Sequence, residues 1–454
     1  MLSFLFASAG AKGIEHIVAL NSSTPTFGEL VRVSARIGCL SFGGPAGQIA
    51  LMHRELVDER RWLDEEEYLN ALNFCHLLPG PEAQQLATWI GWRFHGVKGR
   101  LAAGLLFVIP GALVILALST LYAYAANLNW FAALFLGIKA AVLAIVAQAL
   151  IRIGGRALNT DFKKFVAFLA FAGLFLFNLP FPIIVLGAGA LGILVAHCRP
   201  DWIALKQVNN PAANGPAPWG QTTSTVLLWT AIWAAPMVLV WTTVGPDHVL
   251  WDIGSFFSQL AVVTFGGAYA VLAYMAQEAV QGFSWLSAGE MADGLGLAET
   301  TPGPLIMVTQ FVGYLAAFRA PEPFTPLVAG IIGAGLTTWV TFAPCFLWIF
   351  AFAPWIERLE NARWLRGGLS TLTAAVVGVI ANLALWFAFH VLFTRVGAVD
   401  YGPLYLALPD WQSFNWRAAL LAVSAAVMIF RLKWNILSVL AVTALGGLAL
   451  GWLA

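Results

Sequence analysis

The amino-acid sequence predicts an all-α polytopic membrane protein made of two inverted-topology repeats with broken, re-entrant helices. Of the 454 residues, 60% are hydrophobic and only 10% are charged, whereas soluble domains carry about 25% charged residues. Apolar runs recur along the chain at lengths near the roughly 20 residues that a membrane-spanning helix needs. Two kinds of Gly/Pro break also recur in both halves at one fixed spacing.

A polar segment divides the apolar runs into two groups. Residues 198–224 are rich in Pro, Asn and Gly, a composition typical of a linker. We therefore expect an N-terminal segment (1–25), a first repeat (26–197), a cytoplasmic linker (198–224) and a second repeat (225–454). The expected spans are 101–125, 130–151, 165–178 paired tightly with 181–197, 224–243, 325–353, 368–393, 414–430 and 434–453.

Three landmarks repeat between the halves at the same separation of 223 residues. They are Phe42-Gly43-Gly44 with Phe265-Gly266-Gly267, Trp62-Leu63 with Trp285-Leu286, and Pro79-Gly80-Pro81 with Pro302-Gly303-Pro304. Three matches without a gap indicate an internal repeat.

The basic residues indicate that the second repeat is inverted. Arg54, Arg60 and Arg61 follow the first FGG break, whereas the matching stretch of the second half, residues 279–290, contains no Lys or Arg. Because Lys and Arg concentrate in cytoplasmic loops, we expect a cytoplasmic N-terminus and a periplasmic C-terminus in a bacterial inner membrane.

The same rule predicts re-entrant hairpins. The loops at 53–61 and 96–100 are both basic, so the segment between them should leave the membrane on the side where it entered. Its arms, 64–78 and 82–95, are short for full crossings, with Pro79-Gly80-Pro81 at the tip. Irregular backbone at that depth must be buried in protein or line a water-filled cavity. Two tilted full spans are the alternative.

The broken tips suggest an anion site. Proline suits the first turn of a helix, and the first amides of a helix lack carbonyl partners, so that they and the helix dipole attract anions. Inverted repeats would bring four such tips together at the bilayer midplane, as in transporters with discontinuous helices. The alternative is that the Gly and Pro residues only allow kinks or close helix packing.

Neutral donors surround these tips and suit a tetrahedral oxyanion. The predicted binding residues, breaks and donors together, are Phe42, Gly43, Gly44, Pro45, Gln48, Pro79, Gly80, Pro81, Gln84, Gln85, Thr264, Gly266, Gly267, Tyr269, Thr300, Thr301, Pro302, Gly303, Pro304 and Gln310.

Two charged residues are the main candidates for coupling. Glu82 follows the first tip, and its counterpart 223 residues later is Leu305. A carboxylate beside an anion must be protonated or displaced, which would couple protons to transport; alternatively Glu82 only favours the helix N-terminus. Lys139 either faces the site or extends to the interface. Weaker candidates are Arg32, Arg36, Glu55, Arg93, Glu278, Asp293 and Glu299, with His53 and His76 as proton relays or packing residues.

The sequence indicates neither an enzyme nor a cofactor. The cysteines Cys39, Cys75, Cys198 and Cys345 lie far apart and form no metal-ligand spacing. We recognise no nucleophile–base set, metal cluster or nucleotide-binding loop. The net charge of +1 gives no reason to expect a nucleic-acid partner.

The stretches "FGGPAGQIALMHRELVDERRW" and "HLLPGPEAQQ", with "TFGGAYAVLAYMAQEAV" and "TTPGP" in the second half, resemble the long, two-domain members of the chromate ion transporter family. The resemblance is strong over 36–112 and 258–318. It implies export of chromate, carried as a sulfate look-alike and driven by the proton gradient or the membrane potential, and it implies functional roles for the FGGP and PGPE residues. A passive anion channel or a sulfate transporter is the competing interpretation, and a homodimer is possible.

Overall fold

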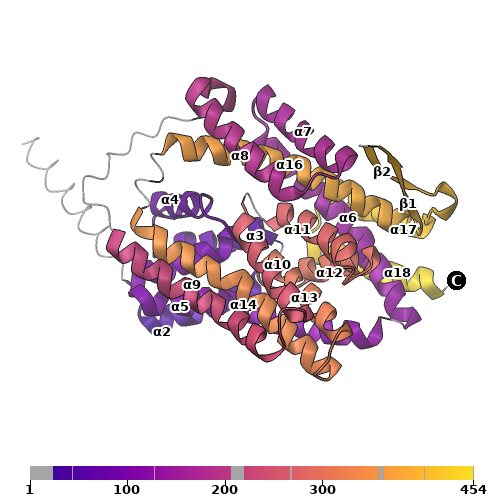
Figure 1. Cartoon of the computed structure of the whole chain (residues 1–454), viewed down its shortest axis with the longest axis horizontal. Helices are drawn as coiled ribbons and strands as arrows, with labels where there is room; N and C mark the ends of the chain where they lie inside the picture. The colour runs from indigo at the N-terminus through magenta and orange to yellow at the C-terminus, as the bar shows by residue number, and fades with distance from the viewer. Residues whose placement is uncertain are drawn as a thin grey trace, which may run out of the picture.

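The computed structural model describes residues 24–452 apart from residues 43, 127, 206–218, 266–267, 356–358, 360–361 and 403. The described chain is almost entirely helical, which confirms the predicted all-α membrane fold (Figure 1). Six described helices are long and apolar enough to cross a membrane. Large hydrophobic side chains such as Leu113, Phe168 and Leu186 are exposed on the outer faces of these helices and their neighbours, as expected for surfaces that contact lipid.

The first half contains seven helices and one π-helical turn among the described residues. They are α2 (Phe27–Leu40), α3 (Gly44–His53), the turn η1 (Arg54–Glu59), α4 (Glu65–Cys75), α5 (Glu82–Ala125), α6 (Asn129–Ala157), α7 (Asp161–Phe177) and α8 (Phe181–Cys198). The backbone of α5 leaves helical geometry at His95 and Gly96. It therefore consists of a short arm, 82–94, and a long helix, 97–125.

The second half repeats this order after α9 (Trp219–Thr243). The elements are α10 (Val249–Val263), α11 (Ala268–Gln277), the π-helical turn η3 (Glu278–Gly282), α12 (Ala288–Thr300), η4 (Leu305–Met307), α13 (Val308–Arg319), α14 (Pro326–Phe352), α16 (Arg363–Leu392), α17 (Trp416–Ala426) with the π-helical turn η7 (Val427–Arg431), and α18 (Ile436–Trp452). The predicted spans correspond to the long helix of α5 and to α6, α7, α8, α9, α14, α16, α17 with η7, and α18.

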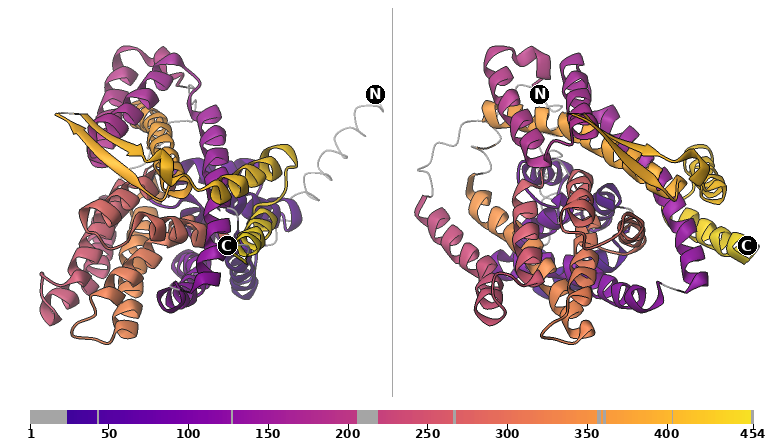
Figure 2. Two further views of the ribbon diagram at one scale, coloured as in Figure 1. Left: turned by 90° about the vertical axis from the view of Figure 1, so that its right-hand side faces the viewer. Right: turned by 45° about the vertical axis from the view of Figure 1, so that its right-hand side comes forward.

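One element was not predicted. Strands β1 (Val396–Tyr401) and β2 (Leu404–Pro409) form an antiparallel hairpin between α16 and α17. It lies at the periphery of the helical body, against α7 (Figures 1 and 2). The segment is too short to be found as a long apolar run, and the side chains of β2 are only partly buried.

Details of the backbone repeat at the 223-residue spacing. Helix α4 begins after Asp64, whose side chain accepts a hydrogen bond from the Glu67 amide, and α12 begins after Ser287, which caps Glu290 in the same way. The amides of Trp62 and Trp285 donate to carbonyls six residues earlier, both at 2.8 Å. Equivalent positions therefore fold into equivalent turns, because a side-chain cap and a π-helical turn recur at the same places in both halves.

One long helix of each half packs mainly against helices of the other half. Helix α6 of the first half packs against α17 and α18, and α16 of the second half packs against α7 and α8 (Figure 1). Glycines allow the closest approach, since Gly447 lies against the Ala133 carbonyl and Gly192 against the Gly367 carbonyl. Side chains at either glycine would collide with the neighbouring backbone, so these contacts set the distance between the helices.

The two hairpins open toward opposite ends of α5. In the first, Glu67 near the start of α4 pairs with Arg93 at 2.6 Å, beside the start of the long helix of α5. In the second, Ser287 at the start of α12 lines a cavity together with Ala126, just past the other end of α5. The helix between spans about 43 Å at 1.5 Å per residue. The inversion of the second repeat relative to the membrane stays a prediction.

The inverted orientation can be tested by labelling a symmetric pair of positions. Asp58 and Gln281 are both exposed and lie 223 residues apart. They occupy equivalent loops of the two repeats, of which the first is basic and the second has no Lys or Arg. In a background in which the exposed Cys39 and Cys198 are replaced by Ser, we expect an impermeant maleimide to label Gln281→Cys in intact cells and Asp58→Cys only after permeabilisation. Labelling of both positions from one side would contradict the inversion.

Candidate functional site

Each Pro-Gly-Pro motif forms the sharp tip between two short helices. The first tip joins α4 to α5, and the second joins α12 to η4 and α13. The central glycines, Gly80 and Gly303, have φ angles of +122° and +94°. These values are strongly disfavoured for residues with a Cβ atom, so glycine is required at the centre of each tip.

Each tip hydrogen-bonds to the break of the opposite half. The Gly80 amide donates to the Thr264 carbonyl at 2.7 Å, and the Gly303 amide donates to the Ser41 carbonyl at 2.9 Å. Ser41 and Thr264 come directly before the two FGG breaks, and they differ by 223 residues, as the two glycines do. The structure thus places each tip against the buried residue that precedes the FGG break of the opposite half.

Side chains reinforce this junction. The Gln48 amide nitrogen donates to the Gly303 carbonyl at 2.5 Å, and the Gln85 amide nitrogen donates to the Pro79 carbonyl at 2.6 Å. Both glutamines are buried. A Cβ atom on Gly111 of α5 would lie 2.5 Å from the Pro302 carbonyl oxygen. The second tip is therefore enclosed by α3 and by the long helix of α5, both from the first half.

The junction changes which groups are available to an anion. The amides of Gly80 and Gly303 already donate to carbonyls, so the first amides of α5, at Glu82 and Ala83, are the helix-terminal donors left near the first tip. Gln84 is fully buried next to them, and its amide nitrogen donates to Thr88 at 3.1 Å. Its side-chain oxygen, an acceptor, has no hydrogen-bond partner within the described chain, so this side chain can offer an anion only the second N–H of its amide nitrogen.

The other predicted binding residues lie at the tips and breaks, with the exception of Gln310. Thr264, Thr300 and Thr301 donate their hydroxyls to carbonyls of their own helices, and Phe42, Pro45, Pro81 and Pro304 flank the tips and breaks. Gly43, Gly266 and Gly267 lie outside the described residues. Gln310 instead donates to the Ala112 carbonyl at 2.9 Å and borders an apolar cavity of about 460 Å³ between α5, α9 and α14.

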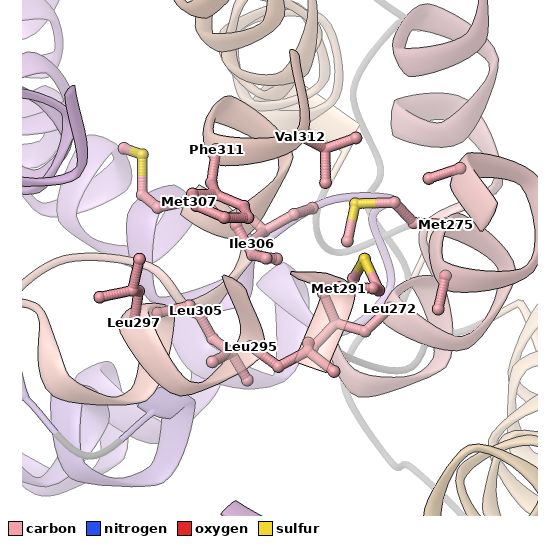
Figure 3. Close-up of a cluster of buried hydrophobic side chains, with 14 of the residues drawn as sticks. Leu272, Met275, Met291, Leu295, Leu297, Leu305, Ile306, Met307, Phe311 and Val312 are labelled. Carbon is pink, nitrogen blue, oxygen red and sulfur yellow. The ribbon is translucent and has the colours of Figure 1, made fainter. Parts of the chain in front are cut away.

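Glu82 lies at the first tip and is 7% exposed. His76, at the end of α4, approaches its carboxylate, with Nδ1 3.5 Å from Oε1. The equivalent residue in the second half, Leu305, packs in a buried apolar cluster with Leu297 and Ile306 (Figure 3). The two tips therefore share a backbone path but differ in chemistry.

Lys139 lies away from the tips, in an ion pair. Its Nζ is 3.0 Å from Oδ1 of Asp293 on α12, whose other oxygen accepts a hydrogen bond from Tyr122 at 2.6 Å. Asp293 precedes Thr301 by eight residues, or about 12 Å along a helix. The pair borders a cavity of about 230 Å³ near the start of α12, so that Lys139 satisfies a buried carboxylate there.

Two of the weaker charged candidates, His53 and Glu55, lie at the end of α3 and in the π-helical turn η1 that follows it. Glu55 is fully buried and pairs with Arg36 at 3.2 Å and with Arg60. His53 contacts Glu65 at 2.6 Å, and this hydrogen bond raises the pKa of His53 above its ordinary value. These groups organise the loop on the side predicted to be cytoplasmic, and their described ion pairs and hydrogen bonds are with one another and not with the tips.

Glu299, which the sequence suggested only as a weaker candidate, lies close to the junction. This residue is 3% exposed and accepts a hydrogen bond from Tyr269 at 2.8 Å. Tyr269 follows the second FGG break, and Glu299 precedes the second tip by three residues. A signal was present, because the residue 223 positions earlier is His76, the neighbour of Glu82.

The fold and the junction together define a class, that of multi-pass membrane transporters with discontinuous helices. The family model for the chromate transporter matches residues 28–193 and 251–452. The chain therefore belongs to the chromate transporter family, and both halves carry the match.

Curated relatives extend over most of the chain. A chromate transport protein of Pseudomonas aeruginosa is 32% identical over 429 residues, covering 92% of this chain and 90% of the relative. A chromate transport protein of Cupriavidus metallidurans is 28% identical, covering 80% and 83%. A probable chromate transport protein of Synechococcus elongatus is 29% identical, covering 78% and 82%. No solved structure gives a significant match.

The tip geometry predicts that Gly80→Ala destabilises the protein. The new Cβ would meet Gln85 Nε2 at 2.8 Å and Cys345 Sγ at 2.9 Å, at a φ of +122°. Backbone strain alone costs roughly 1–3 kcal/mol, so the midpoint of thermal unfolding in detergent should fall by several degrees. Gly187→Ala, in α8 with nothing within 4 Å of its new Cβ, is the control; equal midpoints for the two variants would show that the tip tolerates a side chain.

Proposed function

We propose that this protein exports chromate, or a tetrahedral dianion of the same shape such as sulfate, across the bacterial inner membrane as a secondary transporter. Family membership and the names of its relatives support chromate as the substrate. The proton gradient or the membrane potential would drive export. The N-terminus would lie in the cytoplasm and the C-terminus in the periplasm.

The observation that carries this proposal is the pair of hydrogen bonds between each tip and the opposite break. They bring the start of α5, with Gln84 and the amides of Glu82 and Ala83, next to the second FGG break, which supports a site there. Neutral donors suit a dianion that must be released again, because full positive charges would hold it strongly in a medium of low dielectric constant. The binding site proposed here is this region.

The direct contact between the tips and the opposite breaks favours a carrier over a passive channel. Gly80 and Gly303 bind backbone carbonyls of the opposite half, so an anion passing through the centre must first separate these groups. A cycle in which the tips separate and close again is the alternating access expected of inverted repeats.

Glu82 supplies a reason for coupling to protons. A carboxylate and a unit negative charge 4 Å apart repel by about 4 kcal/mol at an effective dielectric constant of 20, and a dianion doubles this repulsion. Glu82 is buried at the tip, and His76 is the ion-pair partner of its carboxylate among the described residues. Binding of the anion would therefore favour uptake of a proton by Glu82 or His76.

Gln84→Leu should weaken anion binding because it removes a donor at the centre while conserving most of the side-chain volume. We expect roughly a tenfold rise in KM, equivalent to about 1.4 kcal/mol, in counterflow of labelled chromate and sulfate in proteoliposomes. Gln310→Leu is the matched control, because Gln310 borders the apolar cavity outside the junction. If Gln310→Leu raises KM and Gln84→Leu does not, the site lies elsewhere.

Glu82→Gln should separate coupling from binding. We expect counterflow without a pH gradient to persist, whereas the dependence of net transport on an imposed pH gradient should be greatly reduced, since a side-chain amide at this position cannot take up and release a proton as a carboxyl group does. Glu66→Gln, at an exposed position on α4, controls for the lost charge. An unchanged pH dependence in Glu82→Gln would exclude this residue as the coupling group.

A further inference from the structure

Glu299 is a buried carboxyl group that the proposed transport cycle does not yet use. It is 3% exposed at the end of α12, and only one of its oxygens has a partner: Oε1 accepts the hydrogen bond from Tyr269. Within the described chain, Oε2 is buried without a hydrogen-bond partner. An ionised carboxylate has about four sites that accept hydrogen bonds, so a charge here would be very poorly compensated.

The surroundings of Glu299 favour its neutral form. Within the described chain, Tyr269 from α11 donates a hydrogen bond to it, whereas Arg152 from α6 acts on it only electrostatically and its side chain is exposed. Helices α13 and α16 also pack against α12. The α13 cation, Arg319, is paired with Glu290, whereas the α16 groups Arg363, Arg366 and His390 lie at the ends of that helix.

A neutral carboxyl fits the observed hydrogen bond. A carbonyl oxygen and a carboxylate oxygen both accept from a tyrosine hydroxyl, so the hydrogen bond from Tyr269 to Oε1 allows a proton on Oε2. Burying an unpaired carboxylate instead costs several kcal/mol even after relaxation of the surroundings. The burial of Glu299 and the lack of a described partner for Oε2 therefore favour the protonated carboxyl group.

Glu299 and its partner Tyr269 lie next to the breaks in both halves. Its partner Tyr269 follows the second FGG break, and a Cβ atom on Gly44, in the first break, would lie 3.6 Å from the Tyr269 hydroxyl oxygen. Thr301, two residues after Glu299, leads into the second tip. The Tyr269–Glu299 pair thus contacts or adjoins three of the four breaks, and any separation of these breaks would alter it.

The repeat gives each tip a titratable residue at the same position. Glu299 corresponds to His76, which approaches Glu82 at the first tip. The first tip therefore has the His76–Glu82 pair, and the second has the Tyr269–Glu299 pair, built from different residue types on the same backbone.

We propose that Glu299 is a second proton-carrying group of the transporter, neutral in this conformation and ionised when the breaks separate. On separation, the hydrogen bond from Tyr269 breaks, the O–H bond of the carboxyl group breaks, and the proton passes to water that enters the junction, leaving one negative charge on Glu299. The reverse step restores the neutral acid. This inference rests on the proposed transport function and adds a proton site to it.

The test combines a spectroscopic and a transport measurement on the purified full-length protein. Infrared spectra of wild type and Glu299→Gln should differ by a protonated-carboxyl C=O band, present in the wild type at neutral pH and absent from the variant. In proteoliposomes, Glu299→Gln should keep counterflow of labelled chromate within about threefold and lose most of the proton movement that accompanies net transport. Glu322→Gln, at an exposed position, is the control.

Tyr269→Phe keeps the inference testable if Glu299→Gln does not fold. It removes the hydrogen bond that Glu299 accepts within the described chain, so the pH profile of net transport should shift. An unchanged carboxyl band in Glu299→Gln, or wild-type proton movement in that variant, would overturn the role of Glu299. Absence of counterflow in the wild type with both chromate and sulfate would instead overturn the proposed function, and the infrared result would stand separately.

Discussion

The hydrogen bonds from the glycine of each tip to the carbonyl before the opposite break hold the centre of this molecule together. An unpaired backbone amide buried in protein costs about 1–3 kcal/mol, and within a bilayer water is not available to satisfy it. Gly80 and Gly303 therefore each depend on the other half of the chain for a partner. Neither half can satisfy its own broken helices, so the two must assemble for either to be stable in a membrane.

The packing of the long helices extends this mutual dependence to the periphery. Helices α6 and α16 each take their main neighbours from the opposite half, and glycines such as Gly192 and Gly447 bring the backbones into direct contact. Because close-packed interfaces shift between discrete arrangements instead of deforming continuously, a movement of one half should be passed to the other. This coupling is what alternating access at a shared centre requires.

The same backbone carries different chemistry in the two halves. Glu82 corresponds to Leu305, and His76 corresponds to Glu299. The first tip therefore has a glutamate beside a histidine, whereas the second has a buried leucine and, three residues before the tip, a buried glutamate. The transporter is thus symmetric in fold and asymmetric in charge. Such asymmetry puts different titratable residues at the two tips, which a purely symmetric pair of repeats would not have.

The sequence by itself determined the class of fold, the positions of the spans, the two kinds of break and their 223-residue spacing, because hydrophobicity and Gly/Pro punctuation act locally along the chain. Only the tertiary structure decided which groups meet. It showed that the amides of Gly80 and Gly303 are occupied, that Lys139 serves Asp293, and that Glu299 lies at the junction. These partners lie between 30 and 262 residues apart in sequence, and no local pattern encodes a contact between segments that only the packing of two whole halves brings together.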